Sequence, residues 1–108
     1  MHPSDHPLLV ITSITGLDAA RALARAMVEQ GLAACAQLQA IESVYVWQGK
    51  LCQGEEQRIL FKTRVGQQAA LEAAIRALHS DELPALYVLK PDAMLPEFAD
   101  WIARQTGG

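Results

Sequence analysis

The sequence predicts an α+β fold of the ferredoxin-like type: a βαββαβ sandwich with an extra C-terminal helix and a long hairpin between its second and third strands. First, short β-branched runs and helical apolar stripes follow one another in the order β-α-β-β-α-β-α. Second, a chain of 108 residues can build one hydrophobic core and no more. We therefore expect a single domain over residues 1–108, with residues 1–7 as a flexible N-terminus.

The first strand and helix have clear signals. Leu8–Ser13 is an apolar, β-branched run typical of a buried strand. A helix from about Leu17 to Gln30 is expected to follow, with Thr15 as its N-cap and Gly31 as its C-cap. Its apolar residues recur at three- and four-residue spacing and predict the buried face: Ala20, Leu23, Ala24, Met27 and Val28.

A long hairpin is predicted next. Ala33–Trp47 has strand character, Gln48-Gly49-Lys50 is typical of a tight turn, and the chain returns through residues 51–53 and 55–63. Its arms exceed the usual five or six residues of a strand. Because an exposed ribbon of β-branched and aromatic residues would aggregate in a monomer, we expect an obligate homo-oligomer. The alternative is a bulge or break that folds the hairpin back onto its own sheet.

Three elements complete the expected fold. A second helix runs from about Gly66 to Leu78, and a polar turn, His79–Glu82, leads through Pro84 into a strand over Leu83–Leu89. A last helix covers about Pro96–Gln105. The apolar positions expected to pack are Leu71, Ala74, Ile75 and Leu78 in the second helix and Leu95, Phe98, Trp101 and Ile102 around the third.

Composition and motifs exclude several classes of function. The formal net charge of −3 argues against nucleic acid as a partner, and no apolar run is long enough to cross a membrane. The first residues lack the features of a secretory signal, so a cytoplasmic location is expected. The chain has no nucleophile elbow, phosphate-binding glycine loop or H-E-x-x-H motif, and we expect no enzymatic activity.

Four segments carry a family resemblance. They are GLAACA at residues 31–36, SVYVWQGK at 43–50, LFKTR at 60–64 and HSDELP at 79–84. In this order and spacing they resemble the CutA divalent-cation tolerance proteins over about Leu8 to Ile102. The resemblance implies a compact homotrimer built through sheet edges and hairpins, and a link to copper or another divalent cation that folding does not require.

The resemblance also implies a metal site. In the family, a His at the position of His79 is associated with copper, together with a Cys near the end of the first strand and a Glu just after the turn's Pro. Here the first strand ends without a Cys, and Ala85 follows Pro84. Only His79 carries over, with Glu82 nearby, so these two are the candidate metal ligands. The alternative for His79 is a structural role at the end of a helix.

Other side chains are candidates for binding. Tyr45 and Trp47 share one face of the hairpin and are favoured as interface anchors. With Lys50, Lys62 and Arg64 they could also form an inter-subunit cleft for a small anionic ligand, as in PII-type trimers. The alternative is that these cations are solvated or ion-paired. Cys35 and Cys52 are expected to be small core residues. His2 and His6, with Asp5, could form at most a loose cation site at the N-terminus.

Taken together, the expected function is that of a homotrimeric divalent-cation (copper) tolerance protein with a metal-binding or signalling role and no catalysis. Two alternatives remain open at this point. One is a trimeric PII-like sensor of a small ligand or anion, and the other is a trimeric scaffold for another protein.

Overall fold

The computed structural model describes residues 2–108, and its helices and strands follow one another in the predicted order. Met1, the first residue of the predicted flexible terminus, lies outside the described residues. The strands are β1 (Pro7–Ile14), β2 (Cys35–Trp47), β3 (Lys50–Arg64) and β4 (Leu86–Leu89), and the α-helices are α1 (Leu17–Glu29), α2 (Gln68–Leu78) and α3 (Pro96–Gln105). Two short 3-10 helices, η1 (Pro3–Asp5) and η2 (Val65–Gln67), precede β1 and α2.

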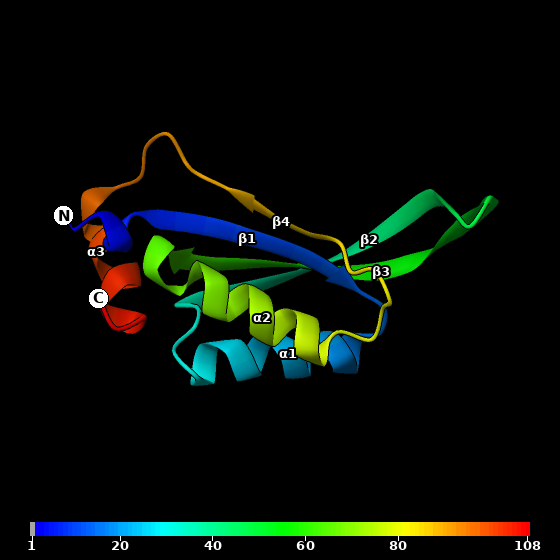
Figure 1. Cartoon of the computed structure of the whole chain (residues 1–108), viewed down its shortest axis with the longest axis horizontal. Helices are drawn as coiled ribbons and strands as arrows, with labels where there is room; N and C mark the ends of the chain where they lie inside the picture. The colour runs from blue at the N-terminus through cyan, green and yellow to red at the C-terminus, as the bar shows by residue number, and fades with distance from the viewer. Residues whose placement is uncertain (1) are drawn as a thin grey trace.

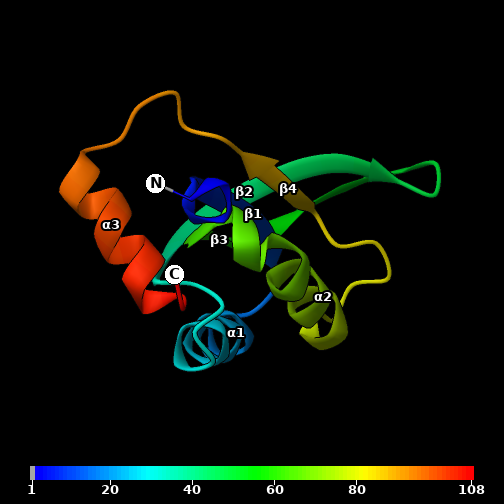
Figure 2. The same ribbon diagram turned by 60° about the vertical axis from the view of Figure 1, so that its left-hand side comes forward.

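The four strands of the described chain form one sheet in the order β2-β3-β1-β4, and each neighbouring pair is antiparallel. Helices α1 and α2 lie side by side against one face of this sheet, as Figures 1 and 2 both show. The α3 helix and both termini lie at the end of the sheet opposite the hairpin tip (Figure 1). This is the predicted α+β sandwich with an extra C-terminal helix.

The core lies between the sheet and the two helices. Alternate residues of β1 and β3 point toward the helices, because successive side chains of a strand face opposite sides. Val10 pairs with Phe61 across these strands, and both are fully buried. From the helices, the buried residues are Ala20, Leu23, Ala24 and Met27 of α1 and Leu71 and Ile75 of α2.

The C-terminus of α1 agrees with the prediction, but its N-terminus does not. The N-cap is Gly16 and not Thr15, and no side chain caps the helix; Gly16 takes a φ of 96°. At the C-terminus, Gly31 takes a φ of 72° one residue beyond the C-cap, Gln30. There the N–H of Leu32 donates to Met27 O at 3.0 Å and the N–H of Gly31 to Val28 O at 3.0 Å. This Schellman pattern satisfies the last carbonyls and ends the helix at a residue that favours left-handed backbone.

The hairpin is more regular than its sequence indicated, and its first strand begins at Cys35 and not at Ala33. Pairing of β2 with β3 is unbroken from Cys35 opposite Lys62 to Trp47 opposite Lys50, so neither Gly54 nor a bulge interrupts it. Gln48 and Gly49 form a two-residue turn with φ values of 51° and 77°. Because β1 ends opposite Gln57, residues 41–47 and 50–56 continue beyond the sheet as a two-stranded ribbon. Figure 1 shows this ribbon extending along the molecule's long axis, which spans 47 Å.

Two predictions are corrected, the start of the last strand and the burial of three side chains at helix ends. The last strand begins at Leu86 and not at Leu83, because residues 79–85 form an irregular loop anchored to β1. Three side chains predicted to pack are exposed: Val28 of α1 at 38%, Leu78 of α2 at 56% and Leu95, the N-cap of α3, at 67%. All three lie in the first or last turn of a helix, where fewer neighbouring residues cover a side chain. The predicted flexible terminus includes η1, whose Asp5 contacts the Arg64 guanidinium.

Candidate functional site

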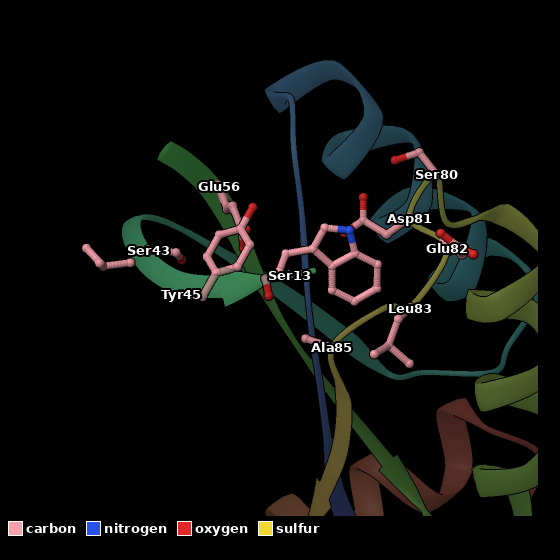
Figure 3. A pocket seen from close by; sticks show the side chains of 11 residues that line it. Ser13, Ser43, Tyr45, Glu56, Ser80, Asp81, Glu82, Leu83 and Ala85 are labelled. Carbon is pink, nitrogen blue, oxygen red and sulfur yellow. The ribbon is translucent and has the colours of Figure 1, made fainter. Parts of the chain in front are cut away.

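A cleft of about 630 Å³ opens between the base of the hairpin ribbon and the loop that joins α2 to β4. Figure 3 shows its two walls: Ser43, Tyr45 and Glu56 on one side, and Asp81, Glu82 and Leu83 on the other. Ser13, at the end of β1, lies at its base. This volume is in the usual range for small-molecule sites, so the cleft is the candidate functional site of one chain.

The hairpin wall is built by strand alternation. Tyr45 and Trp47 lie two residues apart on β2 and therefore share a face, as the sequence predicted, and both line the cleft. Glu56, opposite Ile41 in the ladder, belongs to the same face and also lines the cleft. Tyr45 is 47% exposed and Trp47 38% exposed, so both rings are open to solvent in the single chain.

The opposite wall is a loop pinned at both ends to β1. At its start, the Nε2 atom of His79 lies 2.7 Å from the Ser13 carbonyl oxygen. At its end, the hydroxyl of fully buried Thr12 donates to the Ala85 carbonyl oxygen at 2.6 Å. These two contacts, from consecutive residues of one strand, hold the acidic segment 80–85 beside the hairpin.

His79 has both ring nitrogens engaged. A carbonyl oxygen can only accept, so Nε2 carries the proton and donates to Ser13. The other nitrogen, Nδ1, then accepts from the backbone N–H of Asp81 at 3.0 Å. His79 is also the C-cap residue of α2. The structural role that the sequence left as an alternative therefore accounts for every hydrogen-bonding group of this ring.

This geometry bears directly on the predicted metal ligands. Glu82 is exposed in the cleft wall, and His79 offers no free lone pair while its two bonds stand. Within residues 2–108, no three His, Cys, Asp or Glu side chains lie close enough together to hold a metal ion. The residues of one chain in this arrangement do not fit a copper centre, which needs several donors around one point.

The predicted cationic residues are separated within one chain. Lys50 lies at the hairpin tip, whereas Lys62 and Arg64 lie at the other end of β3, roughly 40 Å away at about 3.3 Å per residue. The Nζ atom of Lys62 lies 5.2 Å from the centre of the Phe98 ring. None of the three lines the cleft within the described chain, so any joint role with Tyr45 or Trp47 requires a second copy.

Arg64 has an internal role that its sequence context did not reveal. Its side chain is only 11% exposed and donates to the Thr106 carbonyl at 2.9 Å through Nη2. It also donates to the Ser4 carbonyl at 3.3 Å and lies 3.6 Å from an Asp5 carboxylate oxygen. This guanidinium therefore ties both ends of the chain to β3 through bonds to Ser4 and Thr106, in addition to the ion pair with Asp5.

The cysteines and the N-terminal histidines do not form a site. Cys35 and Cys52 are half-buried, which corrects their predicted place in the core. They lie opposite Lys62 and Tyr45, ten ladder positions or roughly 33 Å apart, so they cannot pair within one chain. The Nδ1 atom of His2 bonds Ser4, 2.7 Å from its hydroxyl, and no metal cluster includes His6 among the described residues.

The sequence did not predict several residues that build the cleft, among them Thr12, Ser13 and Glu56. The sequence predicts Thr12 and Ser13 only as strand residues and gives no role to Glu56. A detectable signal existed for Thr12: a hydroxyl within an apolar strand needs a buried partner. No signal existed for Glu56, because its approach to segment 80–85 depends on tertiary structure.

Comparison with known proteins gives one consistent result. A family model described as CutA1 divalent ion tolerance protein matches residues 8–105. A divalent-cation tolerance protein CutA from Thermococcus kodakarensis is 31% identical over 97 residues, which cover 90% of this chain and 93% of that protein.

Solved structures of similar proteins agree with this fold. The CutA structure from Synechococcus elongatus PCC7942 is 37% identical with a TM-score of 0.89, and the match covers 93% of this chain and 89% of that one. A protein from Nostoc sp. PCC 7120 described as PII-like CutA, in apo form, is 29% identical with a TM-score of 0.88, over 92% of this chain and 96% of that one. No helix within residues 2–108 has the length and apolar character needed to span a membrane.

Proposed function

The chain belongs to the CutA1 divalent ion tolerance family, and we propose that it acts in tolerance of copper or another divalent cation, as a non-catalytic homotrimer. The observation that carries this proposal is the family match over residues 8–105, which spans every strand of the sheet except the first residue of β1. A cytoplasmic location stays a prediction.

Growth under metal stress tests the role in tolerance. We expect a strain that lacks this protein to stop growing at lower concentrations of copper, or of another divalent metal in a graded series, than its parent. Restoring the wild-type chain should restore the parent's dose response. Identical dose responses of deletion and parent strains across the whole metal series would reject the proposal.

The exposed apolar surface supports the trimer. On the hairpin face opposite the aromatic rings, Val44, Val46 and Leu51 are 62%, 69% and 76% exposed. On the edge strand β4, Tyr87 and Leu89 are each about half exposed. Burying the hairpin side chains would contribute roughly 1–2 kcal/mol each. Two-stranded ribbons are marginal alone and exposed sheet edges invite pairing, so neighbouring copies are the natural cover for both surfaces.

Light scattering of the purified protein tests this assembly. At micromolar concentration we expect three times the 11.8 kDa mass of one chain. Replacing Val46 and Leu51 together by Asp should dissociate the assembly, whereas Leu95→Asp, at an equally exposed residue far from the hairpin, should not. A monomeric wild type would overturn the trimer.

The metal ligands His79 and Glu82 remain a prediction from the resemblance. Metal binding at His79 has to displace the bond to Ser13 or the bond from Asp81. Calorimetric titration with Cu²⁺ of the wild type, His79→Ala and Glu82→Gln tests it: weaker binding by both variants is the expected result. Isotherms identical to the wild type's would remove the residue concerned from the site.

A trimeric sensor of a small anion is the second candidate function, favoured by the likeness to the PII-like protein from Nostoc. It would require Lys62 or Arg64 of one copy to approach Tyr45 and Trp47 of another. A thermal-shift series separates the candidates, since nucleotides and other anions would stabilise a sensor of this kind and divalent metals would not.

A further inference from the structure

We propose that the cleft between the hairpin and segment 80–85 binds a small organic cation, such as an alkylamine or a quaternary ammonium compound. This assignment goes beyond the role in metal tolerance and does not depend on it. It stands on the size of the cavity, on the aromatic rings in one wall and on the sign of the charges around it.

The size of the cavity favours a molecule over an ion. At about 630 Å³, the space is many times larger than the coordination sphere of one metal, and small-molecule sites fall in the range of about 300–1,000 Å³. The acidic side chains around it do not converge, since no group of three within residues 2–108 is close enough to ligate a metal. Dispersed carboxylates around an open space suit a charge that is spread over several atoms.

The rings supply the contact that selects a cation. Tyr45 and Trp47 come from the same face of β2, line the cleft and remain 47% and 38% exposed. The described chain stacks its other aromatic pair, Phe98 and Trp101, but leaves these two rings without an aromatic partner. The faces of tyrosine and tryptophan rings carry negative potential, and quaternary ammonium groups bind to them with little loss of hydration.

The charged side chains that line the cleft are all acidic and also favour a cation. Glu56 lines the cleft from the hairpin, and Asp81 and Glu82 line it from the loop. No Lys, Arg or His is among the lining residues of the described chain. The ion pairs found within residues 2–108 are Arg25–Glu29 and Arg64–Asp5, so none of the three carboxylates is neutralised internally. An anion would meet repulsion from three carboxylates here, whereas a cation meets attraction from both walls.

The two faces of the hairpin allow both this site and the trimer. Tyr45 and Trp47 line the cleft, as does Val44, whereas the more exposed Val46 and Leu51 lie on the opposite face of the hairpin and do not line it. A neighbouring copy that packs on Val46 and Leu51 would lie on the face of the hairpin that turns away from Tyr45 and Trp47. The loop wall is also preformed, because Thr12 and His79 hold its two ends, so binding requires little ordering of the chain.

Titration of the full-length protein with tetramethylammonium chloride and with putrescine dihydrochloride tests the proposal, with calorimetry and tryptophan fluorescence as readouts. We expect saturable binding that weakens as sodium chloride is raised. Trp47→Leu and Glu56→Gln should each weaken binding by about two- to fivefold, the range for one cation contact at a partly exposed site. Glu97→Gln, which removes the same charge from an exposed position on α3, should leave binding unchanged.

Three outcomes would overturn the proposal. The first is no saturable binding of either cation, which is also the result if a side chain of a neighbouring copy fills the cleft. The second is equal weakening by Glu56→Gln and Glu97→Gln, which would indicate a general effect of net charge. The third is stronger binding of sodium acetate or ATP than of the cations. Growth under metal stress is measured separately, so failure here is distinguishable from failure of the proposed function.

Discussion

Replacing His79 by Ala should destabilise the protein and loosen one wall of the cleft. The imidazole joins three parts of the chain: it ends α2, donates to the Ser13 carbonyl of β1 at 2.7 Å, and accepts from the Asp81 N–H at 3.0 Å. Alanine removes both hydrogen bonds and leaves a carbonyl and an amide without these partners. The loop over residues 80–85 then loses its fixed start.

The expected magnitude follows from the two bonds. Each intramolecular hydrogen bond contributes about 0.5–1.5 kcal/mol to stability, so His79→Ala should lower the free energy of unfolding by about 1–3 kcal/mol. For a domain of this size, 1 kcal/mol corresponds to a fall in Tm of about 4–8 °C. His79→Asn should lose about half as much, because its side-chain oxygen can replace Nδ1 as the acceptor from Asp81.

Thermal unfolding at one fixed protein concentration measures these differences, since the Tm of an oligomer depends on concentration. His6→Ala is the control, because His6 is exposed and its side chain makes no hydrogen bond within residues 2–108. A fall in Tm for His79→Ala no larger than that of the control would refute this reasoning. Such a result would mean that water replaces the imidazole as hydrogen-bond partner of Ser13 and Asp81 with no loss of stability.

Three further predictions concern the turn, the chain ends and the loop. Gly49→Ala should destabilise the hairpin by about 1–2 kcal/mol, because Gly49 has a φ of 77°, which alanine adopts only with strain. Gly54→Ala is the control, since Gly54 has equally open surroundings and no positive φ, and it should not destabilise the hairpin. Urea denaturation of the two variants compares them. Arg64→Ala should lower stability by at least about 2 kcal/mol and speed amide exchange near the C-terminus, while Arg58→Ala, at an exposed residue, should do neither. Thr12→Val should lower the free energy of unfolding by about 1–3 kcal/mol, because it leaves the Ala85 carbonyl unpaired. Thr12→Ser keeps the hydroxyl and should retain most of that stability. Similar urea midpoints for the Val and Ser variants would contradict this prediction.

The predicted elements were most accurate where local signals are strong. Apolar periodicity located all three α-helices and the strands of the described chain, since burial on one face imposes the same spacing in any fold. Helix ends and loop boundaries were less accurate: Gly16 replaced Thr15 as the N-cap, and β4 began three residues late at Leu86. The start of β4 depends on contacts with distant residues, here the bonds that join the loop to Thr12 and Ser13 of β1.

The sequence alone determined the order of strands and helices, the long hairpin and the shared face of Tyr45 and Trp47, because each follows from side-chain periodicity along a continuous segment. Tertiary structure alone decided that Glu56 of the hairpin faces Asp81 and Glu82 of the loop across a cleft. The reason is physical: periodicity fixes which side of a strand a residue faces, but only the folding of separate segments against one another brings their charges together or keeps them apart.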